Sequence, residues 1–83
     1  MILLPRENAK VMTKDYKIVP ADYAVVISTT EFERKHVLEC EGKDFRVLRN
    51  CETEESASWE LAHWLNGCAS YDERKRYHIA KYV

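Results

Sequence analysis

The pattern of hydrophobic and polar positions predicts a sheet in the first part of the chain. Residues 23–29 are apolar on both alternating sides, which is typical of a central strand buried on both faces. Residues 16–19 favour β-structure through aromatic and β-branched side chains. Residues 35–40 and 44–49 alternate between apolar and polar positions around a Gly-Lys pair, which predicts a β-hairpin. We therefore expect a mostly antiparallel sheet of three to four strands.

The register of this hairpin follows from its cross-strand pairs. With Gly42 and Lys43 as the loop, glycine takes the first central position of a type II′ turn. Leu38 then faces Val47, and apolar pairs of this kind stabilise a sheet. A shift by one residue would place a glutamate against Phe45, so the register is well specified. The other pairs join Cys40 to Phe45, His36 to Arg49, Glu39 to Arg46 and Val37 to Leu48.

Residues 54–66 carry the signals of an amphipathic helix. Thr53 is a natural N-cap, and the two glutamates after it place negative charge at the positive end of the helix dipole. Gly67 is well placed as the residue that ends the helix. One apolar stripe has the spacing that faces a core. The stripe consists of Ala57, Leu61, Trp64, Leu65 and Cys68.

The two ends of the chain are harder to assign. Ser70 and Glu73 form a capping box, which favours a helix that begins at Tyr71. Residues 76–83 are rich in aromatic and β-branched side chains, which favours a last strand. We expect a short helical turn followed by that strand. Residues 1–15 form either an N-terminal arm or a short helical turn.

Together these elements predict a small α+β fold, with one domain over residues 1–83 and the sheet packed on one main helix. A chain of 83 residues has a marginal core, so every large apolar side chain matters. The expected core comprises Val25, Ile27, Leu38, Phe45, Val47, Ala57, Leu61, Trp64 and Leu65.

Composition narrows the class of protein to a folded, soluble and cytoplasmic one. Apolar residues make up 46% of the chain and charged residues 33%, which is typical of a globular domain. No apolar run approaches the ~20 residues that cross a bilayer. The apolar start at residues 1–4 is too short for a signal peptide. The net charge of −1 lacks the basic surplus usual in nucleic-acid binders.

The three cysteines, an odd number, argue against a disulfide framework. Cys51 lies roughly 20 Å along the predicted hairpin from Cys40, and the helix separates it from Cys68 by roughly 25 Å. Both spans are too long for a disulfide, so Cys40–Cys68 is the one open pair, and we expect reduced core thiols. A helix N-terminus favours a Cys51 thiolate. The neighbouring glutamates oppose it, so we expect no catalytic nucleophile there.

A metal site is the next candidate. His63 and Cys68 approach a metal-ligand spacing, and His36, Cys40 and His78 are further donors. The sequence has no C-x-x-C pair, and a glycine ends the predicted helix between His63 and Cys68. We therefore expect a surface histidine and a core cysteine, with no metal and no other cofactor.

Trp59 lies opposite the apolar stripe of the predicted helix, together with Glu55, His63 and Asn66. An exposed tryptophan in this setting is typical of a protein–protein hot spot. The alternative is that the N-terminal arm or the C-terminal segment covers the ring. In a protein this small we favour the covered arrangement.

The run Arg74-Lys75-Arg76, followed by Tyr77, gives a second candidate surface. Cations interleaved with tyrosines can bind nucleic acid through phosphate contacts and base stacking. The alternative, which we favour, is a solvated face whose charge is balanced by the preceding Asp72 and Glu73.

No sequence motif indicates an enzyme: paired catalytic carboxylates, a glycine-rich phosphate loop and the common hydrolase patterns are all absent. The leading hypothesis is a small non-enzymatic factor that regulates or inhibits another protein by binding it. A phage or mobile-element protein, such as an anti-CRISPR-type inhibitor, is an example of this class. The alternative hypothesis is a nucleic-acid-binding regulator that uses the basic C-terminal segment. A homodimer is compatible with either.

Overall fold

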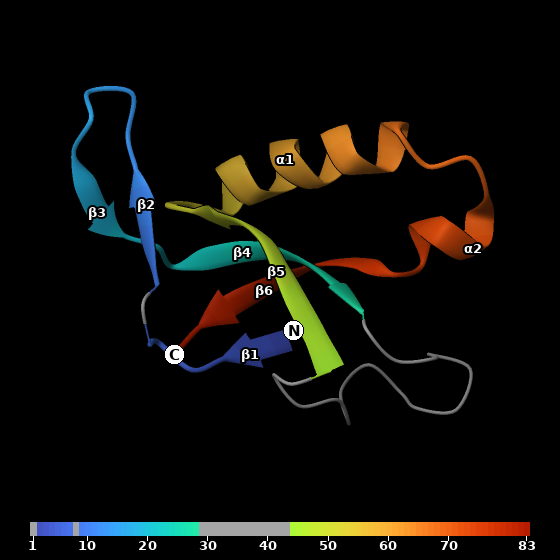
Figure 1. The fold of residues 1–83 in the computed structure, drawn as a ribbon, viewed down its shortest axis with the longest axis horizontal. Helices are drawn as coiled ribbons and strands as arrows, with labels where there is room; N and C mark the ends of the chain where they lie inside the picture. The colour runs from blue at the N-terminus through green and yellow to red at the C-terminus, as the bar shows by residue number, and fades with distance from the viewer. Residues whose placement is uncertain (1, 8, 29–43) are drawn as a thin grey trace.

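A four-stranded mixed sheet forms the centre of the molecule in the computed structural model, which describes residues 2–7, 9–28 and 44–83 (Figure 1). The strand order is β1-β6-β4-β5. β4 is antiparallel to both neighbours, whereas β1 runs parallel to β6. The α+β class is confirmed, with one parallel pair in an otherwise antiparallel sheet. The strands are β1 (Ile2–Leu4), β4 (Tyr23–Ser28), β5 (Phe45–Cys51) and β6 (Tyr77–Tyr82).

β4 is the central strand that its sequence predicts. Val25 and Val26 are both fully buried although they point to opposite faces of the sheet. Val26 belongs to a core cluster of small and apolar side chains on one face. Val25 pairs in register with Ile79 on the other face. A strand buried on both faces needs no alternation of polarity, and the continuous apolar run reflects this.

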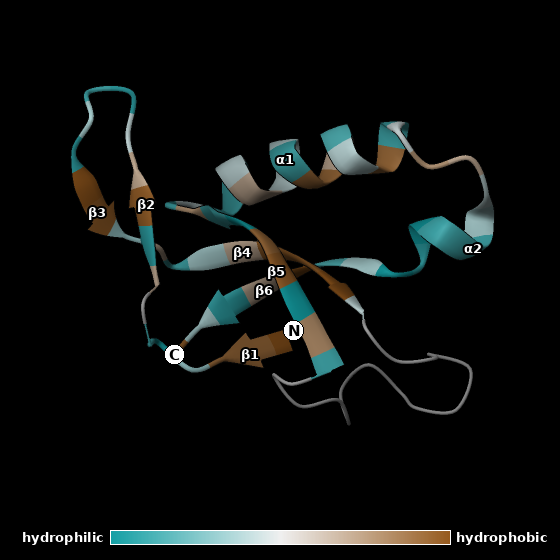
Figure 2. Ribbon diagram, viewed as in Figure 1, coloured by the Kyte–Doolittle hydropathy of each residue, from teal (hydrophilic) through white to brown (hydrophobic). Residues whose placement is uncertain are grey.

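The main helix, α1 (Glu54–Asn66), has the predicted bounds and covers the face of the sheet that carries Val25. The side-chain oxygen of Thr53 caps it by accepting a hydrogen bond from the Ser56 amide at 3.1 Å. Gly67 ends it in the right-handed region, at φ −84°, so the helix stops without using the conformational freedom of glycine. Figure 2 shows hydrophobic positions recurring on the side of α1 toward the sheet.

The apolar stripe of α1 is buried to different depths. Ala57 is fully buried, which lets the helix backbone approach the sheet closely. Leu61, Leu65 and Cys68 are half-buried. Trp64 keeps 36% of its surface exposed, so its assignment to the core was wrong. The ring is too large for the edge of the helix–sheet contact and extends beyond it.

The core cluster on the opposite face depends on small residues and on the chain ends. Phe45, expected in the core, is buried there, whereas Ile27 is only half-buried. Val47 is 42% exposed, so its prediction as a core residue was wrong. β5 is one of the two outer strands of the described sheet, and a β-bulge at Leu48 distorts it beside Val47. The cluster contains Ile2, Leu4, Ala9, Ala21, Ala24, Val26, Phe45, Ala80 and Tyr82.

A second, two-stranded sheet projects beside the first (Figure 1). Its strands are β2 (Lys10–Met12) and β3 (Ile18–Pro20). β3 corresponds to the strand predicted at residues 16–19 but starts later. The described part of residues 1–15 is largely extended, as one alternative held, yet it contributes β1 and β2 instead of forming a free arm. The base of this hairpin is held by Ala21, whose amide donates to the carbonyl of Ala9 at 2.8 Å.

The C-terminal assignment is confirmed as a short helix followed by a strand. α2 (Tyr71–Arg74) begins after Ser70, whose hydroxyl accepts a hydrogen bond from the Glu73 amide at 3.2 Å. The Glu73 carboxylate accepts in turn from the Ala69 amide at 2.8 Å, so both halves of a capping arrangement are present. β6 then runs back along β4. The predicted strand 35–40, its turn at Gly42-Lys43 and the core residue Leu38 lie outside the described residues.

Candidate functional site

The outer face of α1 presents a large aromatic ring to solvent. Trp59 is 74% exposed, so the interpretation that another segment covers it was wrong. Glu55, His63 and Asn66 are exposed on the same side of the helix. Their spacing of four and seven residues from Trp59 places all four side chains along one stripe. We call these four residues the Trp59 face.

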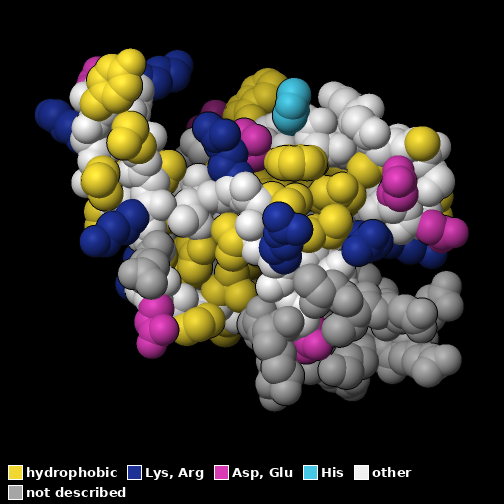
Figure 3. Space-filling model, viewed as in Figure 1, with side chains coloured by type: hydrophobic (Ala, Val, Ile, Leu, Met, Phe, Trp, Pro, Cys, Tyr) yellow, Lys and Arg dark blue, Asp and Glu magenta, His cyan; other side chains and the backbone are white. Residues whose placement is uncertain are grey.

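The direction of this face follows from the opposite side of α1. Ala57 has no exposed surface, and Leu61 is half-buried against the sheet. At ~100° per residue, a helix that turns these residues inward must turn Trp59 outward. The ring is therefore presented by a capped, packed helix and not by a mobile loop. Figure 3 shows hydrophobic and histidine side chains side by side along this edge of the molecule.

The surroundings of Trp59 are acidic. Residues 52–66 contain four glutamates and neither lysine nor arginine. Glu60 pairs with Arg49 of β5 at 3.6 Å, which ties the helix to the sheet. Glu52, Glu54 and Glu55 are exposed. The face thus combines a hydrophobic ring with a negative rim.

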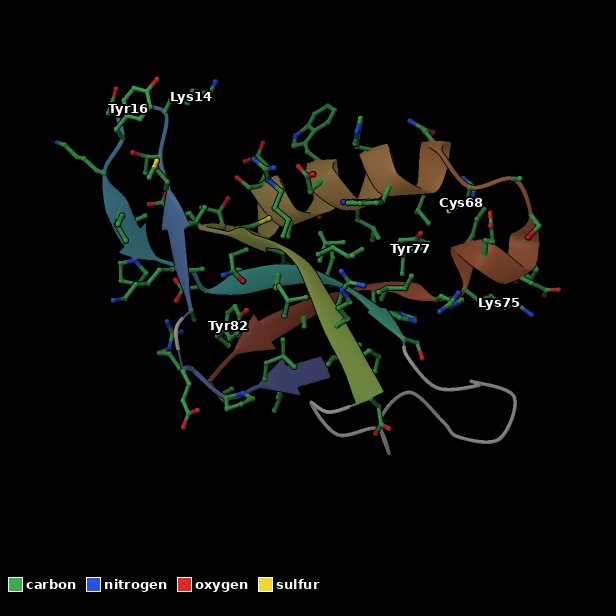
Figure 4. All side chains as sticks on the ribbon, viewed as in Figure 1. Lys14, Tyr16, Cys68, Lys75, Tyr77 and Tyr82 are labelled. Atoms are coloured by element: carbon green, nitrogen blue, oxygen red, sulfur yellow. The ribbon has the colours of Figure 1, made fainter. Side chains whose placement is uncertain are left out.

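Trp64, only five positions along the same helix, is partly used within the fold. Its ring stacks on Tyr77 of β6, with centroids 6.0 Å apart and planes inclined by 22°. The Cys68 thiol donates to the Trp64 carbonyl at 3.4 Å. Desolvation, followed by the neighbouring Cys68, raises the pKa of the Tyr77 hydroxyl. Figure 4 shows Tyr77 and Cys68 where the helix end meets β6.

The basic C-terminal segment is partly engaged by intrachain contacts. The Lys75 ammonium lies 3.9 Å from Asp72 and 4.6 Å from the centre of the Tyr71 ring. Arg76 donates to the carbonyl of Ser28 at 3.1 Å. Arg74 is exposed, like the other two cations.

The tyrosines of that segment differ in what they offer. Tyr71 is 73% exposed, whereas Tyr82 is buried and donates its hydroxyl hydrogen bond to Asn50. Tyr77 is half-buried beneath Trp64. One tyrosine, rather than several, is therefore fully presented next to the cations, which weakens the case for base stacking there.

The cysteines and histidines show no assembled chemistry in the described part of the chain. Cys51 is buried, as predicted, and Cys68 is half-buried; both are free thiols. Burial, and then the nearby Glu60, raise the pKa of the Cys51 thiol, which opposes a thiolate nucleophile. Among the described residues no group of three or more His, Cys, Asp and Glu could hold a metal ion. Cys40 and His36 lie outside these residues.

Sequence reasoning missed a second exposed apolar surface, on the β2–β3 hairpin. Met12, Tyr16 and Ile18 are each more than half exposed there. The signal was present as two apolar pairs on either side of a polar run at residues 13–17. It was overlooked because this run contains no Gly or Asn, the residues that usually mark a hairpin turn.

Comparisons with protein-family models, with curated proteins and with solved structures give no match for this chain. Within the described residues, no helix has both the length and the apolar character needed to cross a bilayer. Function is therefore inferred from the chain's own geometry.

Proposed function

We propose that this chain is a small non-enzymatic factor that docks on another protein through the Trp59 face. The observation that carries the proposal is the 74% exposure of Trp59 on a helix whose opposite side is packed against the sheet. Such a factor would regulate or inhibit its partner by binding to the partner's surface and covering it.

The physical argument rests on what an exposed indole does at an interface. Tryptophan is enriched among the few residues that carry most of the binding energy of protein complexes. Its large ring gains about 2 kcal/mol or more when a partner pocket removes it from water. Because α1 already fixes the backbone, little further ordering is needed on binding, and preorganisation of this kind favours affinity.

The acidic rim defines the kind of partner surface that fits. Glu55 lies on the same stripe as the ring and Glu52 is exposed just before the helix, so a partner with an apolar pocket bordered by lysine or arginine would match this surface. Such rim charges mainly speed association and exclude wrong partners, whereas the buried ring supplies affinity.

The test is capture of partners from a lysate of the native host, with wild-type chain and the Trp59→Ala variant side by side. We expect one protein to be captured by the wild type and lost with Trp59→Ala. Tyr71→Ala is the matched control, because Tyr71 is equally exposed (73%) but lies on α2.

Nuclease treatment of the same lysate separates the two classes of partner. If capture survives nuclease and depends on Trp59, the proposal stands. If it disappears with nuclease and with Arg74→Ala, the chain binds nucleic acid through its basic segment instead. Capture that is unchanged by Trp59→Ala would contradict the proposed surface.

A further inference from the structure

The β2–β3 hairpin is a projecting arm with an apolar stripe and a basic border. We call residues 10–20 the hairpin arm. Met12 is 58% exposed, Ile18 67% and Tyr16 84%. Lysines at positions 10, 14 and 17 are also exposed. Figure 3 shows hydrophobic side chains running along this arm with Lys or Arg side chains on either side.

The register of the arm explains why these side chains point outward. Met12 faces Ile18 across the two strands, and Val11 faces Val19. Val11 packs against the core cluster, so the alternation of a strand turns Met12 and Ile18 the other way. The apolar pair is thus a fixed consequence of how the arm attaches to the body.

The tip of the arm holds Tyr16 in an unusual backbone conformation. Its φ is +61°, in the left-handed region that rarely accepts a tyrosine. The Tyr16 amide donates to the Thr13 carbonyl at 3.0 Å, and the Thr13 amide donates to the Lys17 carbonyl at 2.8 Å. These bonds close the turn, and the ring lies at the end of the arm beside Lys14 (Figure 4).

The arm and the segment that carries the Trp59 face have opposite charges, although Glu60 of that segment is paired with Arg49. Residues 10–20 contain three lysines and one aspartate, a net charge of +2. Residues 52–66 contain four glutamates and no lysine or arginine, a net charge of −4. Each surface also offers exposed apolar side chains, which are Tyr16, Met12 and Ile18 on one and Trp59 on the other. The two surfaces are complementary in both charge and hydrophobicity.

Among the described residues, no ion pair joins a lysine of the arm to a glutamate of residues 52–66 within one chain. In Figure 1 the arm stands beside the N-terminal end of α1 and projects toward the same side of the molecule as the helix. In a two-fold dimer, each copy would place its arm on the Trp59 face of the other. A closed symmetric dimer of this kind makes the same contact twice.

We propose that a second copy of this chain covers the Trp59 face, with the hairpin arm of each copy seated on the Trp59 face of the other. This dimer rests on the proposed function, because it uses the same Trp59 face. The second copy would occupy that face whenever no other protein is bound there. A partner protein must then displace the second copy, which makes docking dependent on concentration.

Sedimentation equilibrium of two charge-reversal variants tests this arrangement. The arm variant carries Lys14→Glu and Lys17→Glu, and the helix variant carries Glu52→Lys and Glu55→Lys. The wild type should form dimers, and each variant alone should dissociate roughly tenfold more readily or worse, because like charges then face each other. Mixing the two variants should restore dimers, because every contact in the mixed dimer again joins opposite charges.

Matched variants separate this outcome from a general charge effect. Glu7→Lys with Asp72→Lys reverses two exposed acidic residues away from the Trp59 face and should leave the dimer unchanged. A monomeric wild type at every accessible concentration would overturn the proposal. Unchanged dimerisation of both charge-reversal variants would also overturn the proposal. So would a failure of the mixed variants to form dimers.

Tyr16→Asn tests the role of the arm with a variant that we expect to remain folded. Asparagine tolerates a positive φ, so the change should preserve or raise the melting temperature while removing the ring from the arm. We expect weaker dimers from this well-folded variant; unchanged dimerisation would contradict the role of the arm. A monomeric wild type that still captures a protein through Trp59 would leave the proposed function intact while removing the dimer.

Discussion

The two tryptophans of α1 differ in what surrounds them, although they are five residues apart on one helix. Trp64 is 36% exposed and stacks on Tyr77, so part of its surface stabilises the fold. Trp59 is 74% exposed and has a rim of acidic and polar side chains. The same residue type thus packs within the fold on one side of a helix and is presented to solvent on the other.

The rotation of α1 about its axis, and not the residue type, determines whether a tryptophan on this helix packs against the fold or faces solvent. Ala57 and the Glu60–Arg49 pair fix that rotation by bringing one side of α1 onto the sheet. A tryptophan on the outer side of the helix is not needed for this packing against the sheet. Substitutions on the two sides of α1 should therefore have different effects on stability.

Replacing each tryptophan in turn should give unequal losses of stability. Trp64→Ala removes the stack on Tyr77 and a partly buried ring, and should lower the free energy of unfolding by about 2 kcal/mol. Trp59→Ala should change it by no more than about 0.5 kcal/mol, as is usual for exposed positions. Urea denaturation measures both. Equal losses would mean that Trp59 is also part of the fold.

Replacing an alanine by leucine on each side of α1 compares the sheet-facing side with the exposed side and leaves both tryptophans in place. Ala57→Leu forces extra volume between the helix and the sheet and should cost about 1–3 kcal/mol. Ala62→Leu adds the same atoms at an exposed position and should be nearly neutral. Thermal unfolding of the two variants gives the comparison directly. A neutral Ala57→Leu would mean that the helix is not packed closely there.

Removing the N-cap tests how firmly the helix holds both tryptophans in place. Thr53→Ala deletes the acceptor for the Ser56 amide and should cost about 1 kcal/mol. Thr53→Ser keeps the oxygen and should retain most of the stability. If preorganisation of α1 matters for docking, Thr53→Ala should also weaken partner capture although Trp59 is unchanged. Circular dichroism and the capture assay provide the two measurements.

The pH dependence of stability should report on the environment of His78 in β6. Burial lowers the pKa of the His78 imidazole below its ordinary value of 6.5, although a hydrogen bond with the Lys75 backbone opposes the shift. The unfolded chain therefore binds a proton at a higher pH than the folded chain does. Stability is fully present above about pH 6.5 and falls as the pH decreases toward the folded pKa.

The slope should not exceed one proton, or about 1.4 kcal/mol per pH unit. Replacing the histidine, as in His78→Gln, should remove this component, whereas His63→Gln on the Trp59 face should keep it. Urea midpoints between pH 7.5 and pH 5 measure the slope. A slope that survives His78→Gln and vanishes with His63→Gln would place the titration on the outer face of α1 instead.

Local signals predicted the parts of this fold that local physics determines. The cap at Thr53, the capping box at Ser70 and the apolar run of β4 each specify an element within a few residues, and all three are confirmed. The outward direction of Trp59 also followed from helical spacing. Helical spacing could not predict whether a distant segment covers the ring, because such coverage depends on long-range contacts.

The incorrect and missed predictions also concern features that depend on long-range contacts. Val47 has the alternation of a core residue, but its exposure depends on the position of β5 at the outside of the described sheet. Ala24 and Ala80 are fully buried because neighbouring strands and the chain ends approach closely, and alanine carries little sequence signal of this. The hairpin arm was missed because Tyr16 occupies a backbone conformation usually reserved for other residues.

The parallel pairing of β1 with β6 has a consequence for how the chain folds during synthesis. Ile2 pairs with Ala80, 78 positions later, so β1 cannot take its place in the sheet until β6 has been synthesised. Contacts of such long sequence separation slow folding. Until then the apolar β1 strand stays exposed, and its early association with other chains competes with completion of the sheet. The edge of the sheet is therefore the point at which folding is completed.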